Sequence, residues 1–319
     1  MKPLSNDELD RAQGAVVASA AGDALGSQYE FGPAIPSDVE LTFGIGHFGH
    51  APYEWTDDTS MAIPILQAIA DHKSLLSSKV LGDIASVWQA WAVESPDVGV
   101  QTQAVLRSIA KSPQESHCRK ASREYHKERG RSAGNGSLMR TGPVALGFLR
   151  KRAEGDLVEA AARIAQLTHW EDDNADACVL WSLAIRQAIR DGDFDMERLL
   201  PWIPSSRRDR WKGIVAEALE PGVKATDFAE NNGWVVGAFQ QALAAINTTD
   251  SLEGALGEAI RGGNDTDSVA AIAGSLAGAY YGMDVLPKEW LKKLHGWPDS
   301  NVSDLLKLVD LAVTAPRAR

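Results

Sequence analysis

Residues 262–279 read GGNDTDSVAAIAGSLAGA, so a polar stretch with two carboxylates runs directly into alanines, glycines and aliphatic residues. A glycine inside a helix costs roughly 0.5–1 kcal/mol relative to alanine. A helix this rich in glycine must therefore gain stability elsewhere, and close backbone packing against another helix is the simplest source. Residues 14–21, GAVVASAA, have the same character. We expect these two helices to pack together at the centre of the molecule.

Helical periodicity continues along the rest of the chain, and almost no segment alternates apolar and polar residues as a half-buried strand would. Ser5 followed by Glu8 has the pattern of a capping box, which predicts a helix start just before Leu9. Neither a repeat nor a low-complexity linker divides the chain, so we expect one all-α domain over residues 1–319. Helices are predicted at Leu9–Leu25, Thr59–His72, Val80–Val93, Val100–Ala110, Leu157–Leu167, Ala175–Arg190, Arg208–Leu219, Trp234–Ile246, Leu252–Arg261, Ser268–Tyr281 and Val302–Thr314.

The composition is that of an ordinary folded protein, with 319 residues, 44% hydrophobic, 24% charged and a net charge of −11. This acidic balance argues against a nucleic-acid binder, which would carry a basic face. Cys118 and Cys178 are too few for a disulfide framework. The first residues show no apolar signal region, and Val269–Tyr281 is shorter than the roughly 20 residues that span a bilayer. We expect a cytoplasmic protein without membrane contact.

Two clusters of oxygen-bearing side chains stand immediately before apolar helical runs, one at Trp55–Ser60 and one at Gly262–Ser268. Asp, Ser and Thr at such positions often only cap the helix. Here each cluster has more oxygens than a cap needs, and carboxylates held at buried helix starts repel one another unless a cation neutralises them. Hard divalent cations prefer such oxygen ligands. Two distant clusters could hold two ions, whereas zinc is excluded because His and Cys are missing at zinc spacing.

Two further segments are rich in glycine and polar residues. Residues 22–31, GDALGSQYEF, end the first predicted helix and carry Glu30, which is either functional or an ordinary surface charge. Residues 134–140, GNGSLMR, form a loop whose glycines let backbone N–H groups approach an anion such as a diphosphate. A Gly-Asn-Gly turn is common, so this loop alone specifies little.

A third glycine pattern, Gly44-Ile45-Gly46-His47-Phe48-Gly49, matches the spacing of dinucleotide-binding loops. Such a site requires a strand before the glycines and a helix after them. His50-Ala51-Pro52 follows instead, which suits a loop. We expect no dinucleotide-binding fold here.

Taken together, these segments resemble the ADP-ribosylglycohydrolase family, which includes the dinitrogenase-reductase-activating glycohydrolases and the ADP-ribosylarginine hydrolases. The motifs occur in family order over most of the chain. They are Gly22–Gly26 with Glu30, Thr56–Thr59, Gly134–Arg140, Thr168-His169 and Gly262–Ala279. The resemblance implies an all-α, compact orthogonal helical bundle with a central two-metal site. The chain departs from the family pattern with Ser268 in place of Thr, Asn264 in place of Gly and Trp234 in place of Tyr.

The resemblance also implies the residues of the site. Two Mg²⁺ or Mn²⁺ ions would be bound by Thr56, Asp57, Asp58, Asp265, Asp267 and Ser268. Glu30, Asp58 and Asp267 are the expected catalytic residues. The expected substrate-binding residues are Gly134, Asn135, Gly136, Ser137, Met139, Arg140, His169 and Trp234.

The activity that follows from the resemblance is metal-dependent hydrolysis that removes ADP-ribose from a modified protein, with ADP-ribosylarginine the favoured linkage. An ADP-ribosylated protein would be the substrate and ADP-ribose the product, and we expect a monomer that binds no nucleic acid. Two alternatives stay open: a non-catalytic relative that binds ADP-ribose or a protein partner, and a hydrolase for a serine, nucleic-acid or small-molecule linkage. A non-catalytic relative should have lost at least one metal-binding Asp, and none is missing here.

Overall fold

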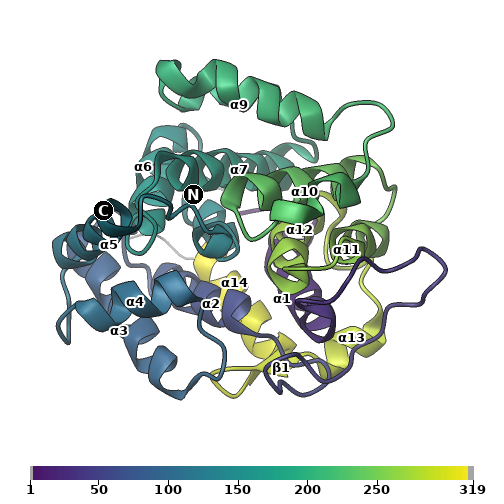
Figure 1. Ribbon diagram of the computed structural model, residues 1–319, viewed down its shortest axis with the longest axis horizontal. Coiled ribbons are helices and arrows are strands. Elements are labelled where there is room, and N and C mark those ends of the chain that lie inside the picture. The colour runs from purple at the N-terminus through teal and green to yellow at the C-terminus, as the bar shows by residue number, and fades with distance from the viewer. Residues whose placement is uncertain (1–2, 315–319) are drawn as a thin grey trace.

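The computed structural model describes residues 3–314, which form a bundle of α-helices with a single two-stranded ribbon (Figure 1). The prediction of an all-α fold is confirmed. The helices are α1 (Asn6–Gly26), α2 (Asp57–Ala70), α3 (Ser78–Glu94), α4 (Val100–Ser108), α5 (Glu115–Arg129), α6 (Glu154–Ala165), α7 (Asp172–Asp191), α8 (Met196–Leu199), α9 (Ser205–Ala218), α10 (Val235–Asn247), α11 (Leu252–Arg261), α12 (Thr266–Tyr281), α13 (Lys288–Lys293) and α14 (Val302–Thr314). Short 3₁₀ helices are η1 (Ser27–Tyr29), η2 (Asn135–Ser137), η3 (Gly142–Phe148), η4 (Leu200–Trp202) and η5 (Ala225–Asn231), and the strands are β1 (His295–Gly296) and β2 (Ser300–Asn301).

Helices α1 and α12 pack along their whole length at the centre of the bundle, as the sequence predicted. Their backbones approach so closely that a Cβ on Gly14 would lie 2.2 Å from the carbonyl oxygen of Gly278, and a Cβ on Gly274 would lie 2.3 Å from that of Ala18. The same holds near the other end of α1, where a Cβ on Gly22 would lie 2.3 Å from the Ala270 carbonyl oxygen. Helices α1 and α12 can therefore approach this closely only because these positions are glycine.

Buried tryptophans attach the surrounding helices to this centre. Trp181 of α7 donates its indole N–H to the Ser275 hydroxyl of α12 at 3.0 Å. Trp88 of α3 donates to the Met61 carbonyl of α2 at 2.9 Å. Trp211 fixes α9, the outer helix at the top of Figure 1, because its N–H donates to a carboxylate oxygen on α7 at 3.1 Å. Each ring thus fills a layer of the core and also satisfies its polar atom.

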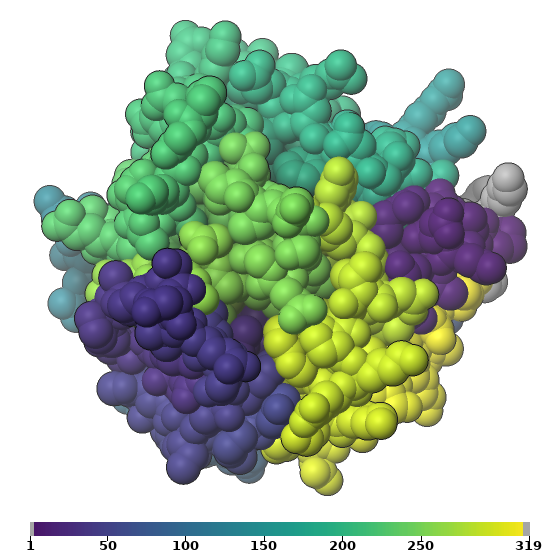
Figure 2. Space-filling view, turned by 90° about the vertical axis from the view of Figure 1, so that its right-hand side faces the viewer, coloured from purple at the N-terminus to yellow at the C-terminus, as the bar shows by residue number. Residues whose placement is uncertain are grey.

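The long connection between η1 and α2 contains no helix, and it lies against the segment that leads into α12. Figure 2 shows it in dark purple beside chain that is more than 200 residues away in sequence. Arg261 donates to the carbonyl oxygens of Pro36 and Val39 at 2.6 and 3.0 Å, and its own carbonyl accepts the N–H of Ile35. The glycine pattern at 44–49 lies in this connection, which confirms that it is a loop.

Helices α5, α8 and α13 were not predicted, and several predicted helices begin two or three residues earlier than expected. Helix α5 was not predicted, because its mean composition is strongly polar and only Glu115, Cys118, Ala121 and Ser122 are buried. Helices α2 and α12 begin two residues earlier than predicted, at Asp57 and Thr266. The carboxylates of both clusters consequently lie in the first turn of a helix or directly before it.

The glycine contact can be tested by one substitution. A Cβ at Gly278 would lie 2.1 Å from the Gly14 carbonyl oxygen, which forces α1 and α12 apart. Overpacking of this kind costs about 1–3 kcal/mol, so we expect Gly278→Ala to lower the free energy of unfolding in urea by that amount. Gly213→Ala in α9 is the control, because its Cβ would meet no atom within 4 Å. It should leave stability unchanged or raise it by about 0.5–1 kcal/mol. Equal stability of the two variants would contradict the packing argument.

Candidate active site in a buried carboxylate cavity

The two oxygen-rich clusters meet where the N-termini of α2 and α12 come together. Thr56, the residue before α2, does not use its side chain as a cap. Its Oγ1 lies 3.2 Å from Asp58 Oδ2 and 3.3 Å from Asp267 Oδ2. Helix capping therefore does not account for Thr56, and the oxygens of the two clusters face one another.

Asp23 of α1 holds this junction together, and the sequence analysis assigned it no role. It is completely buried, and its carboxylate accepts hydrogen bonds from the backbone N–H and hydroxyl of Thr56 (2.8 and 2.7 Å) and of Thr59 (2.9 and 2.6 Å). Burial raises the pKa of Asp23, while the four hydrogen bonds oppose that rise. In the sequence, the only indication of a role for Asp23 is its position directly after Gly22, within the Gly22–Gly26 motif.

Carboxylate oxygens converge in two overlapping groups. The first group consists of Asp23, Asp58 and Asp267, and the second of Glu30, Asp97 and Asp267. In each group, one carboxylate oxygen from every residue lies within 4.8 Å of the others. Asp97 lies in the short segment between α3 and α4, and no motif surrounds it in the sequence. The structure therefore adds Asp97 to the site.

The electrostatics of the cluster require a compensating charge. Burial, together with the neighbouring carboxylates, raises the pKa of Glu30 to about 8 and that of Asp97 to about 8. The same causes raise the pKa values of Asp57, Asp58 and Asp267 well above their ordinary range. Among the described residues that line the cavity there is neither Lys nor Arg. This charge arrangement is unfavourable without a bound cation.

The donor set fits a hard divalent cation. One oxygen of Asp58 (Oδ1) and one of Asp97 (Oδ2) are buried without a hydrogen-bond partner in the part of the chain that the structure describes. Orphaned carboxylate oxygens are costly in a protein interior, and they are the ligands that Mg²⁺ and Mn²⁺ prefer. The Thr56 hydroxyl lies 3.2 Å from Asp58 Oδ2, and the Ser268 backbone N–H donates to Asp267 Oδ1 at 2.9 Å. An acidic cluster that could hold metal ions is thus present.

The glycine loop at 134–136 also lines this cavity, which has a volume of about 280 Å³. Asn135 links this loop to the carboxylates, because its Nδ2 donates to Asp265 Oδ2 at 2.8 Å and to the Asn232 carbonyl oxygen at 2.9 Å. The imidazole of His169 lies against Gly136, where a Cβ would come within 3.2 Å of Nε2. The cavity lining thus combines a carboxylate cluster with a glycine loop and an imidazole, which suits a ligand that carries both hydroxyls and an anion.

A buried relay orients His169. Arg140 Nη2 donates to Thr168 Oγ1 at 2.7 Å, and Thr168 Oγ1 lies 2.8 Å from His169 Nδ1. All three groups are satisfied when the Thr168 hydroxyl accepts from Arg140 and donates to Nδ1. Burial, followed by the charge of Arg140, lowers the pKa of His169 well below its usual value. The imidazole is therefore neutral, and Nε2–H is left as a donor on the side of the glycine loop.

Comparison with known proteins agrees with this geometry. The profile of the ADP-ribosylglycohydrolase family matches residues 4–318. The chain belongs to the ADP-ribosylglycohydrolase family. It is similar to the ADP-ribosylarginine hydrolase Tri1 of Pseudomonas putida, with 31% identity over 90% of this chain and 74% of that protein. It is also similar to the ADP-ribosyl-[dinitrogen reductase] glycohydrolase of Rhodospirillum rubrum, with 27% identity over 89% and 90%.

A solved structure described as an ADP-ribosylglycohydrolase-related protein complex superimposes with a TM-score of 0.70 and 26% identity, over 97% of this chain and 99% of that one. The resemblance inferred from the sequence motifs is confirmed, and so are the expected fold and the expectation of a hydrolase. No helix within residues 3–314 is both long and apolar enough to cross a membrane.

Most residues that the family resemblance singled out lie at the cavity of this ADP-ribosylglycohydrolase. Those that line it are Glu30, Asp57, Asp265, Asp267, Ser268, Gly134, Asn135, Gly136, Met139 and His169. Thr56 and Asp58 lie directly behind them, in the carboxylate cluster.

Three of the expected substrate-binding residues do not line this cavity. Arg140 is completely buried, with its guanidinium 4.1 Å from the centre of the Trp88 ring, so it supports His169 from behind the wall. Ser137 is also buried, and its hydroxyl accepts from Asn174. Trp234 pairs with Gly134 through the backbone, while its ring is 40% exposed outside the cavity lining.

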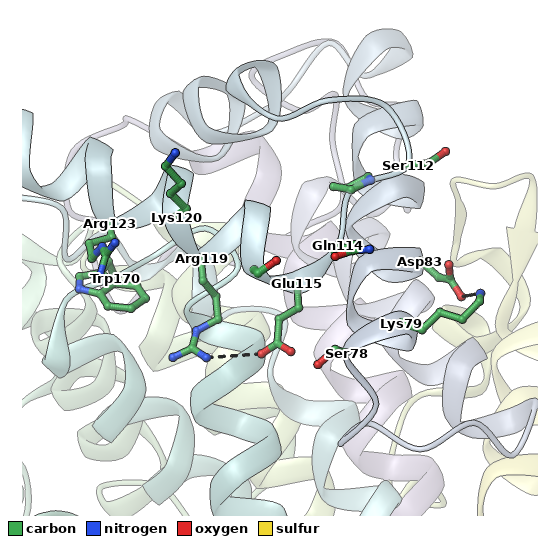
Figure 3. Close-up of a pocket in the computed structure, with 12 residues that line it drawn as sticks. Ser78, Lys79, Asp83, Ser112, Gln114, Glu115, Arg119, Lys120, Arg123 and Trp170 are labelled. Carbon is green, nitrogen blue, oxygen red and sulfur yellow. Dashed lines mark hydrogen bonds and ion pairs between the residues drawn. The ribbon is translucent and has the colours of Figure 1, made fainter.

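A second hollow, of about 770 Å³, lies between α3 and α5 (Figure 3). Its acidic side chains are already paired, since Asp83 lies 2.7 Å from Lys79 and Glu115 lies 2.6 Å from Arg163. Arg119 and Arg123 both lie over the Trp170 ring. Although this hollow is larger, both of its carboxylates are paired with cations, so the carboxylate cavity is the candidate active site.

The His169 relay predicts the effect of Thr168→Val, which preserves shape but removes the hydroxyl. His169 should lose the single tautomer that Thr168 imposes, and we expect the affinity for ADP-ribose to fall about tenfold, as for one lost hydrogen bond to a charged group. Nitrogen-15 NMR of the imidazole would report the tautomer. Thr141→Val is the matched control, because Thr141 is also buried but contacts Ser182 instead. An unchanged Nε2–H signal in Thr168→Val would show that Thr168 does not set the tautomer of His169.

Proposed function

We propose that this protein hydrolyses the bond between ADP-ribose and an arginine side chain of a modified protein. The observation that carries the proposal is one cavity in which a carboxylate cluster faces a glycine loop and a neutral histidine. The first end suits the hydroxyls of the distal ribose, and the second suits the diphosphate. The arginine linkage is supported by the similarity to proteins named ADP-ribosylarginine hydrolase.

Two Mg²⁺ or Mn²⁺ ions are proposed as cofactors, held by Thr56, Asp57, Asp58, Asp265, Asp267 and Ser268. When bound, such ions neutralise the carboxylates and polarise the ribose hydroxyls and water. Asp23 contributes indirectly, because its hydrogen bonds hold Thr56 in place. Ser268 retains the hydroxyl ligand of the family pattern without the methyl group.

The chain's own residues supply the proton transfers. Carboxyl oxygens of Glu30 and Asp97 converge with Asp267, so one can deliver a proton to the leaving side-chain nitrogen while another orients the attacking water. Asn135 and the His169 imidazole hold the far end of the ligand. Asp58 and Asp267 would position the reacting ribose together with the bound ions. The carboxyl separations of ordinary glycosidases do not apply to a site of this kind.

The proposed partners are an ADP-ribosylated protein as substrate and ADP-ribose as product. We propose a cytoplasmic monomer that does not act on nucleic acid, in keeping with the net charge of −11. The alternatives left open by the sequence, a non-catalytic binder and a hydrolase for another linkage, are outcomes of the following test.

The test is release of ADP-ribose from matched peptides that carry the group on arginine or on serine, with Mg²⁺ or with chelator. We expect metal-dependent release from the arginine peptide. Asp267→Asn should lower the rate by more than about 100-fold, since loss of a ligand exceeds the 10–100-fold typical of its supporting residues. Asp172→Asn is the control, because that side chain is 68% exposed and pairs with Arg207 away from the cavity lining. Release from serine alone would overturn the linkage, and no release from either would favour a binder.

A second readout does not depend on activity. Ions that bind only the folded state stabilise it, by about 2.7 kcal/mol at 100 times the dissociation constant. Saturating Mg²⁺ or Mn²⁺ should therefore raise the thermal midpoint of the wild type but not of Asp267→Asn. An unchanged wild-type midpoint would count against the metal site.

Glu30→Gln and Asp97→Asn test the proton transfers. Each variant keeps the size of the side chain but cannot exchange a proton, so kcat should fall by the 10²–10⁴ typical of general acid or base catalysis. The affinity for free ADP-ribose, measured by calorimetry, should stay within a few-fold of the wild type. A loss of kcat below about tenfold would remove that residue from the mechanism.

A further inference from the structure

Three aromatic rings form a corner at the mouth of the carboxylate cavity. Phe31 follows η1, and His47 and Phe48 belong to the long loop before α2. Ring centroids are 5.0 Å apart for Phe31–His47, 6.1 Å for Phe31–Phe48 and 5.0 Å for His47–Phe48, and each pair meets edge to face. Phe31 and Phe48 line the cavity although they are 61% and 40% exposed. We call these three residues the aromatic corner.

Core packing does not explain the aromatic corner. Phe31 has a backbone φ of +58°, a left-handed conformation that is unfavourable for a bulky residue. The conformation is imposed by neighbours, because the Phe31 N–H donates to the Asn264 carbonyl at 2.6 Å. The His47 N–H likewise donates to the Ser27 carbonyl at 3.0 Å. Exposed rings held at a backbone cost are more typical of a binding surface than of a folding requirement.

The position of the corner identifies which part of the ligand passes it. In ADP-ribosylated proteins the distal ribose carries the diphosphate on C5″ and the acceptor side chain on C1″, at opposite ends of the sugar. The glycine loop and His169 form the diphosphate end of the cavity. Glu30, in the carboxylate cluster, is the neighbour of Phe31 in the chain. With the diphosphate at the glycine loop and the ribose at the carboxylates, as the proposed function has them, the acceptor side chain would leave the cavity past Phe31 and Phe48, which also line it.

We propose that the aromatic corner recognises the acceptor and selects arginine. An arginine guanidinium is planar and cationic, and it binds the face of an aromatic ring by a cation–π interaction. A serine side chain has neither a planar group that could stack on the rings nor a positive charge. This inference rests on the proposed function and names the residues that set its acceptor specificity.

The experiment removes the rings without disturbing the loop. Phe31→Asn suits the left-handed backbone, which asparagine adopts more readily than phenylalanine does, and Phe48→Leu keeps an apolar side chain. For this double variant we expect KM for an ADP-ribosylarginine peptide to rise about five- to thirtyfold, the range of one to two cation–π contacts. Its kcat and its affinity for free ADP-ribose should stay within about twofold. The Phe31→Asn/Phe48→Tyr variant should show a smaller rise in KM than the Phe31→Asn/Phe48→Leu variant, because one ring is retained.

Trp202→Leu is the matched control. Trp202 in η4 is 41% exposed, similar to Phe48, and does not line the cavity. Its KM should remain that of the wild type.

The outcomes separate this proposal from the proposed function. If the wild type releases ADP-ribose from arginine but the double variant keeps the wild-type KM, the aromatic corner does not recognise the acceptor and the function stands. If affinity for free ADP-ribose falls as much as KM rises, the rings hold the ADP-ribose group and the inference is overturned. If the wild type does not act on the arginine peptide, the proposed function fails and this inference fails with it.

Discussion

The backbone contact between α1 and α12 continues into the active site. At its far end, a Cβ on Gly26 would lie 2.5 Å from the Cα of Asp267. The glycines that let the central helices touch therefore also bring Asp23 on α1 and Asp267 on α12 to the same point. A larger residue at one of these positions would separate the carboxylates as well as the helices. Fold and site share one geometric requirement, which explains why so much glycine is tolerated in helix interiors.

The second constraint is electrostatic. Several carboxylates are buried together, and the described residues that line the cavity include no cationic side chain to balance them. Protein donors satisfy part of the charge, as the hydrogen bonds from Thr56 and Thr59 to Asp23 show. The remaining oxygens, such as Oδ1 of Asp58, have no partner within the described chain. A protein interior this acidic is costly for the empty fold and suits a site that binds cations.

Around this centre, the cavity lining combines groups with different chemistry. A fully buried arginine, Arg140, acts from behind the wall and orients His169 through Thr168. Burial, together with the charge of Arg140, lowers the pKa of His169, so the imidazole is a neutral donor. Glu30 and the exposed rings of Phe31 and Phe48 also line the cavity. Under the proposed function, the ADP-ribose group and the acceptor would be recognised by different residues, so that one could change without the other.

The sequence alone predicted the helical fold, the central helix pair, both oxygen clusters and the glycine loop, because each depends on residues close together in the chain. Composition and spacing reveal a buried helix or a polar helix start without knowledge of its neighbours. The tertiary structure decided what depends on distant segments. Asp97 has no local motif, and only the packing of α3 and α4 brings it to Glu30. Arg140 lies inside a recognisable motif, yet its burial against Trp88 withdraws it from the cavity. Phe31 and Phe48 form a common surface only because the long loop folds back over the start of α12, and no local pattern encodes such a long-range approach.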